Sequence, residues 1–161
     1  MHTFDDDSGG FDGVERTHVR NVVGVEDFEW VSFGEPSVRV PLSVPLSQAR
    51  VTLISTAGAH EAGKPPLGPG GHAALIPAGA EIELSHDGYD TERASSDPEV
   101  VYPVRTLQAL TDAGVIGSVA PTVVSTMGFV PYGTRLFDRA VPAAVEQIHA
   151  EQSHLALLVP A

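Results

Sequence analysis

Residues 50–56 read RVTLIST, and this stretch decides the fold prediction. The run is short and rich in β-branched residues, and the small residues 57–59 follow it at once, so it predicts a buried strand that ends in a tight turn. His60 comes directly after that turn. Ligands of open α/β sheets collect in the crevice outside the carboxyl ends of the strands. The sequence therefore predicts a site at the end of this strand.

A second junction of the same kind lies at residues 84–90, which read LSHDGYD. Residues 80–84 alternate acidic and aliphatic side chains, as in a strand with one wet face, and His86 stands in the turn that follows. In a parallel sheet, the turns that follow neighbouring strands lie at one edge. We therefore expect His86 and His60 to converge there.

The rest of the chain alternates strand and helix signals. Pro103 suits the first turn of a helix, apolar residues recur on one face between Val104 and Ala113, and Gly114 follows as the C′ residue. Pro142 predicts the start of a final helix in the same way. Extended segments are predicted at residues 72–77, 80–84, 99–102, 115–124 and 154–159, the last as a fully buried strand. This alternation predicts the α/β class, with a mostly parallel sheet flanked by helices.

The chain divides into a tail and one domain. Residues 1–27 hold an acidic run and no sustained hydrophobic period, so they predict a mobile acidic N-terminal tail. Residues 28–161 predict a single compact α/β domain whose first part is irregular. The aromatic patch at residues 28–33 is interpreted as packing on the domain edge, and it is also the candidate contact of a homodimer. Residues 62–71, rich in glycine and proline, predict a loop.

Composition excludes several classes of function. The formal net charge of −12 and only nine Lys and Arg residues argue against a nucleic-acid partner. No apolar run is long enough to cross a bilayer and the start is acidic, so we expect no membrane partner and a cytoplasmic protein. The absence of cysteine in these 161 residues excludes disulfides, thiolate zinc sites and thiol nucleophiles within them. No phosphate loop or dinucleotide fingerprint is present, so no nucleotide cofactor is expected.

Several unusual strings occur in series along the chain and carry a family resemblance. They are residues 51–60, VTLISTAGAH; residues 85–90, SHDGYD; residues 100–107, VVYPVRTL; residues 114–118, GVIGS; and residues 127–128, MG. In order and spacing, the segment from Gln48 to Ala161 resembles the glycine/sarcosine/betaine reductase selenoprotein B and D-proline reductase family, in a short form that contains no cysteine.

The resemblance implies a scaffold more than a reaction. Large members of that family reduce amino-acid-derived substrates at a C–N bond, with a selenocysteine or cysteine on the substrate-binding subunit and a pyruvoyl group on a partner. This chain has neither cysteine nor selenocysteine, so the resemblance excludes that mechanism for this polypeptide alone. It implies a pocket for a small polar substrate and leaves the chemistry open.

Two chemical roles are open for the histidine turns. In the first, His86 is a general acid or base whose tautomer is fixed by Asp90 or Asp97, because imidazole titrates near neutral pH and a carboxylate orients it. His60 is the second catalytic candidate. In the second role, His60, His86 and a carboxylate bind a divalent metal ion, which would be the cofactor. The structural alternative is that both are loop histidines bonded to backbone carbonyls.

The substrate-binding candidates lie around these turns and on the predicted helix. They are Tyr89, Asp97, Tyr102, Arg105, Ser125 and Met127. If the substrate carries a carboxylate, as the resemblance implies, Arg105 is a candidate to bind it through two hydrogen bonds. The alternatives are that Tyr102 packs beneath the helix and that Arg105 lies on a solvated face.

Two functions follow from these residues. The first is a small-molecule enzyme that acts on an amino-acid-derived or similar polar substrate by His/carboxylate acid-base or metal-assisted chemistry. The second is a non-catalytic substrate-binding or accessory subunit of a multi-protein reductase-like or biosynthetic complex, in which another polypeptide supplies the redox group. The corresponding assemblies are a homodimer or a hetero-oligomer with a partner subunit.

Overall fold

Strand β1, Arg50–Ser55, is the centre of a five-stranded sheet in this computed structural model, which describes residues 38, 40–68, 70, 72–86, 89–130 and 132–161. Strands β5, Ser118–Val119, and β6, Thr122–Thr126, both pair in parallel with β1, one after the other along the same side. Strand β7, Leu155–Val159, pairs with β1 in parallel as well, and β3, Ala73–Pro77, pairs antiparallel with β6. The predicted α/β class with a mostly parallel sheet is confirmed.

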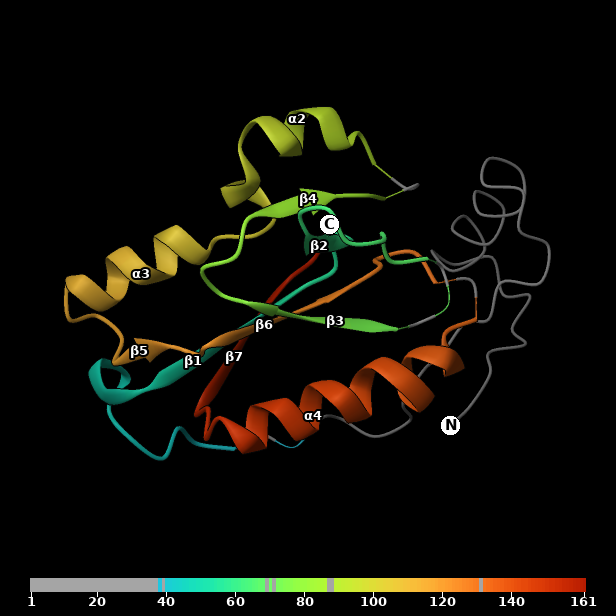
Figure 1. Cartoon of the computed structure of the whole chain (residues 1–161). Helices are drawn as coiled ribbons and strands as arrows, with labels where there is room; N and C mark the ends of the chain where they lie inside the picture. The colour runs from blue at the N-terminus through green and yellow to red at the C-terminus, as the bar shows by residue number, and fades with distance from the viewer. Residues whose placement is uncertain (1–37, 39, 69, 71, 87–88, 131) are drawn as a thin grey trace, which may run out of the picture.

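Helices cover the two faces of this sheet and form a single compact domain (Figure 1). The α-helices are α2, Thr91–Ser96; α3, Val104–Asp112; and α4, Val141–Ala150. Short helical turns are η2, Leu46–Gln48; η3, Pro98–Val100; and η4, Leu136–Ala140, which is a π-helix that runs into α4. Helix α4 lies on one side of the sheet, and α2 and α3 lie on the other side (Figure 1).

A second, two-stranded sheet lies above the main sheet on the α2 side (Figure 1). Its strands are β2, Ala59–Glu61, and β4, Ile82–Leu84, and they run antiparallel. The expectation that the strands before the two histidine turns share one parallel sheet is therefore wrong. His60 lies within β2 and pairs with Glu83 of β4, in a sheet separate from that of β1.

The core lies between the main sheet and α3. Leu53, Ile76 and Val123 are almost fully buried on three neighbouring strands, and Leu107 of α3 packs on the same cluster. Burial of each of these side chains contributes about 2 kcal/mol. Residues that alternate along the strands face this cluster, which explains why the β-branched runs form a sheet here.

Helix α3 matches its prediction at both ends. Gly114 has φ +69° and follows the last turn as the C′ residue, where its amide donates to Thr111 O. Pro103 is the N-cap but offers no side-chain acceptor. The carboxylate of Glu99 instead accepts the backbone N–H groups of Arg105 and Thr106, so the free amides of the first turn are satisfied from a residue outside the helix.

Strand β7 departs from its prediction. It was expected to be fully buried, but Leu155, Leu157 and Leu158 are 41%, 37% and 68% exposed. Among the described strands β7 pairs only with β1, so it is an edge strand. A continuous apolar run cannot by itself distinguish an edge strand from one that is covered on both faces. The predictions for residues 1–27 and 28–33 lie outside the described residues.

Candidate functional site

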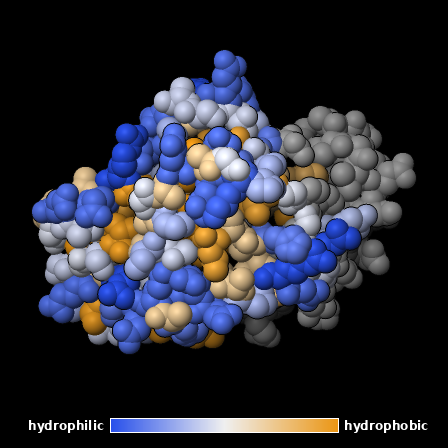
Figure 2. Space-filling view, in the orientation of Figure 1, coloured by the Kyte–Doolittle hydropathy of each residue, from blue (hydrophilic) through white to orange (hydrophobic). Residues whose placement is uncertain are grey.

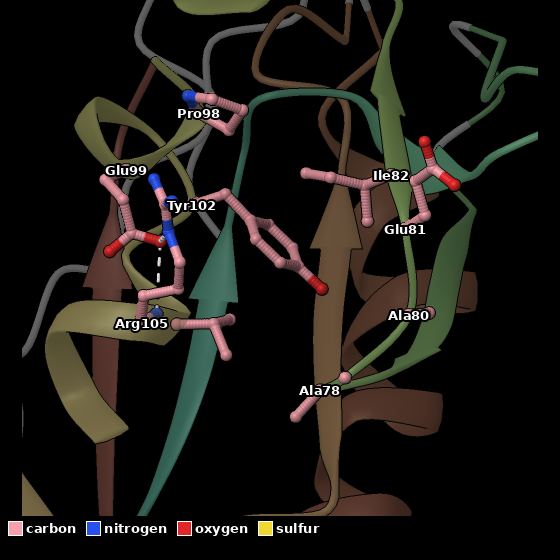
Figure 3. Close-up of a pocket in the computed structure, with 10 residues that line it drawn as sticks. Ala78, Ala80, Glu81, Ile82, Pro98, Glu99, Tyr102 and Arg105 are labelled. Carbon is pink, nitrogen blue, oxygen red and sulfur yellow. Dashed lines mark hydrogen bonds and ion pairs between the residues drawn. The ribbon is translucent and has the colours of Figure 1, made fainter. Parts of the chain in front are cut away.

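A pocket of about 460 Å³ lies between the turn that joins β3 to β4 and the segment that joins η3 to α3 (Figure 3). It brings together two of the predicted substrate-binding residues, Tyr102 and Arg105, with two carboxylates that sequence reasoning did not select, Glu81 and Glu99. The remaining lining is mostly aliphatic: Ala78, Gly79, Ala80, Ile82, Pro98 and Val104. An apolar wall with a few convergent polar groups is typical of small-molecule sites.

Tyr102 supplies the most unusual group of this pocket. The residue is only 4% exposed, and its hydroxyl has no hydrogen-bond partner among the described residues. In Figure 3 the ring extends from the α3 side toward Ala78 and Ile82 on the opposite wall. Burial, with a further contribution from the negative charge of Glu61, raises the pKa of Tyr102 well above its ordinary value, so the hydroxyl stays protonated. Buried hydroxyls in folded proteins are nearly always paired, so this one is a ligand-binding candidate.

Glu99 and Arg105 form the charged rim of the pocket. Arg105 Nε donates to Glu99 Oε1 at 3.3 Å and its guanidinium lies 3.9 Å from Asp97. Burial raises the pKa of Glu99, but the hydrogen bonds from Thr106 and Arg105 outweigh it and lower that pKa overall. The Arg105 side chain remains 78% exposed, so it keeps donors available at the mouth. Its position a few residues before the predicted helix was the sequence signal that could have identified Glu99 as an acceptor for the first-turn amides.

His86 lies elsewhere, at the end of the parallel strands. Its Nε2 accepts the backbone N–H of Gly128, just beyond β6, at 3.2 Å. Its ring is tilted against the Tyr89 ring with centroids 4.7 Å apart, and the Tyr89 hydroxyl donates to Ala57 O, just beyond β1. Burial raises the pKa of Tyr89. His86 and Tyr89 thus tie the segment after β4 to the carboxyl ends of β1 and β6.

His60 does not meet His86 through any contact described for it. It is 4% exposed, with Nδ1 3.2 Å from Glu61 O and Nε2 3.0 Å from Ser85 Oγ. Because a carbonyl oxygen only accepts, Nδ1 donates to Glu61 O, and Nε2 shares a hydrogen bond with the Ser85 hydroxyl. Both nitrogens of His60 are therefore occupied within the protein.

Three other predicted site residues, Asp90, Ser125 and Met127, lie outside the Tyr102 pocket. Asp90 caps α2, its Oδ1 accepting Glu92 N at 3.0 Å, and the sequence reading missed this short helix although an aspartate precedes it. Ser125 is fully buried beside Ser55 and its hydroxyl has no partner in the described part of the chain. Met127 is buried and forms an isolated bridge with Ala57.

A metal centre would need at least three suitable ligands. Over the described ranges, no three His, Asp or Glu side chains gather closely enough to hold a metal ion. His60 also has both ring nitrogens bonded to protein atoms. Within the described part of the chain, His60 and His86 are therefore not gathered with a carboxylate into a metal site, and their role as metal ligands stays a prediction.

The fold and the pocket define a small α/β domain with a cavity lined by Tyr102, Arg105 and two carboxylates. The sequence model described as glycine/sarcosine/betaine reductase selenoprotein B matches residues 74–141. A curated relative, D-proline reductase subunit gamma of Acetoanaerobium sticklandii, is 25% identical over 142 residues. These two matches support membership of the glycine/sarcosine/betaine reductase selenoprotein B and D-proline reductase family and confirm the resemblance in the sequence motifs.

The curated match covers most of this chain but only part of the relative. The alignment covers 85% of this chain and 59% of the relative, so the chain spans about three fifths of the relative's length. No solved structure matches the chain. Of the helices that the structure describes, none has the length and apolar character needed to cross a membrane.

Proposed function

We propose that this chain binds a small, amino-acid-derived zwitterion as a component of a reductase-type system. The observation that carries this proposal is Tyr102, which lines a pocket with charged groups at its rim and whose buried hydroxyl has no partner in the described structure. An unpaired buried hydroxyl costs about 1 to 3 kcal/mol, and a ligand that bonds to it removes this penalty.

The charges at the pocket suit a molecule that carries both signs. Arg105 is mostly exposed and offers donors to a carboxylate. Glu81 belongs to the opposite wall and forms no ion pair with the described residues, so we assign the ammonium or imino group of the ligand to it. Its carboxylate is turned away from the Tyr102 ring in Figure 3, so this contact requires the Glu81 side chain to turn toward the ligand. Glu99 is engaged by Arg105 and Thr106 and sets the position of the guanidinium. The carboxylate of the ligand thus binds at Arg105 and its nitrogen near Glu81.

The reductase connection comes from the relative, which is a subunit of D-proline reductase. The 161 residues contain no cysteine to serve as a nucleophile or electron donor. We therefore favour a substrate-binding role in which a partner subunit supplies the redox group, and the assembly is a hetero-oligomer.

Acid-base catalysis at His86 is the second candidate. It is favoured by the position of this ring at the carboxyl ends of β1 and β6, where ligands of open α/β sheets bind. His60 would then support the turn through Ser85.

Calorimetric titration of the untagged chain with D-proline, sarcosine, betaine and glycine tests the proposal. For the zwitterion that binds, Tyr102→Phe is expected to weaken binding about tenfold, and Arg105→Ala by a similar or larger factor. Arg93→Ala, on the exposed surface of α2, is the control and leaves the affinity unchanged. Affinity that is insensitive to Tyr102→Phe and Arg105→Ala but lost in His86→Gln would move the site to the second candidate.

A further inference from the structure

A second hollow of about 470 Å³ adjoins the Tyr102 pocket. The two share four lining residues, namely Ala78, Gly79, Val104 and Arg105. The turn at Ala78 and Gly79 and the start of α3 at Val104 and Arg105 therefore border both hollows. Together they run along α3 from Tyr102 toward Gln108.

The two hollows differ in chemical character. Glu81 and Glu99 line the first, whereas no carboxylate lines the second. The second is walled by aliphatic side chains, with Val119, Ala120 and Pro121 added to the shared residues. Its polar groups are Arg105 and Gln108, and the Gln108 amide is turned along the helix toward Asp112, 3.3 Å away. Figure 2 shows apolar side chains framed by hydrophilic ones on this face of the molecule.

Gly79 lines both hollows. A Cβ atom at Gly79 would have no heavy atom within 4 Å. Its φ does not fall among the positive glycine values, which occur at Gly58, Gly63 and Gly114. The backbone therefore does not require glycine here, and a larger side chain at this position is a usable probe of the two hollows.

We propose that the two hollows form one binding trough, and that its ligand is an amino-acid-derived carboxylate with an aliphatic extension several carbons long. The inference rests on the proposed function for the placement of the carboxylate at Arg105. The charged head then lies beside Tyr102 and Glu81, and the aliphatic chain lies against Val104, Val119 and Pro121. A ligand of glycine size would leave this second, apolar hollow unused.

The test is a titration of the full chain with unbranched α-amino acids of increasing side-chain length, from glycine through norvaline and norleucine to 2-aminooctanoate, in both enantiomers. Each added methylene is expected to strengthen binding about two- to fourfold, the range set by partial to complete burial of a CH₂ group. Gly79→Val narrows the trough and is expected to abolish this dependence on length. Gly68→Val, in an exposed loop where a Cβ also meets nothing, is the control and keeps the dependence.

The outcomes separate the two ideas. If amino acids bind through Tyr102 and Arg105 but their affinity does not depend on chain length, the trough is wrong and the proposed function stands. If none of them binds, or if binding ignores both residues, the proposed function and the trough fail together. The length series on the unmodified chain decides the matter even if Gly79→Val does not fold.

Discussion

His86 Nε2 accepts the backbone N–H of Gly128 at 3.2 Å, although the two residues lie 42 positions apart in the sequence. This hydrogen bond joins the turn after β4 to the turn after β6, and through them the small sheet to the main one. It also uses the nitrogen that a general base at this position would first be expected to offer.

Replacement of His86 by alanine removes the acceptor of this bond and leaves the Gly128 amide to find another partner. We expect the free energy of unfolding to fall by about 1 kcal/mol, measured by urea denaturation. His149→Ala, on the exposed last turn of α4, serves as the control and is expected to change it by less than about 0.5 kcal/mol. Equal effects of the two substitutions would contradict a structural role for His86.

Gly58 is the position at which the turn after β1 has least freedom. Its φ is +67°, and a Cβ there would lie 2.3 Å from Ser85 O and 2.9 Å from Met127 Sδ. We expect Gly58→Ala to destabilise the protein by at least about 3 kcal/mol, because the left-handed backbone and the steric overlap add. Gly63→Ala shares the positive φ but meets nothing, so it separates strain from overlap and should lose only about 1 kcal/mol.

Glu99 makes stability depend on pH in the acid range. Its folded-state pKa is lowered, so its contribution to stability is complete above the unfolded pKa and is lost as the pH falls through the folded pKa. The unfolding free energy of Glu99→Gln should therefore lie about 1 kcal/mol below that of the wild type at pH 7, and the two should approach each other below about pH 4. Thr106→Val removes one of the donors and should give a smaller version of the same profile. A difference that grows toward low pH would contradict this account.

Substitutions at Asp90 test whether this residue caps α2 or acts as a charged partner of a catalytic group. Asparagine keeps an oxygen that can accept from Glu92 N, and alanine does not. We expect Asp90→Ala to lower the unfolding free energy by about 1 kcal/mol and Asp90→Asn to leave it nearly unchanged. Denaturation of the two variants under one set of conditions is the measurement. Identical losses in both would indicate that the negative charge, rather than the cap, is what matters.

Tyr102 and Tyr89 allow the loss of an unpaired hydroxyl to be compared with the loss of a hydrogen-bonded one. Tyr102→Phe deletes a buried group that has no partner, so the unfolding free energy should rise by about 1 kcal/mol in the absence of ligand. Tyr89→Phe deletes a hydroxyl that donates to Ala57 O, so it should fall by about the same amount. A loss of stability in Tyr102→Phe would mean that its hydroxyl has a partner in solution.

Local patterns predicted much of the fold. The β-branched run of β1 and the apolar period of α3 with Gly114 at its end are properties of short segments, and both elements formed where expected. The pairing of β2 with β4 could not be read in this way, because residues 62–81, which include β3, separate the two strands in the sequence. The exposure of β7 likewise depends on what covers the sheet edge.

The site was only partly predictable for the same reason. Tyr102 and Arg105 were selected from residue type and position, and the structure brings them to one pocket. Their neighbour Glu81 comes from a distant turn, so no sequence spacing relates it to them. The histidines stood out as chemically versatile residues, but their hydrogen bonds to Ser85 and Gly128 became visible only in three dimensions.

The most direct test of the central claim is a crystal structure of the chain with D-proline, or with the amino acid that binds most tightly in the titrations. The account predicts a polar atom of the ligand about 3 Å from the Tyr102 hydroxyl, with the ligand carboxylate on Arg105. A ligand bound against His86 and Gly128, with the Tyr102 hydroxyl still unpaired, would contradict it.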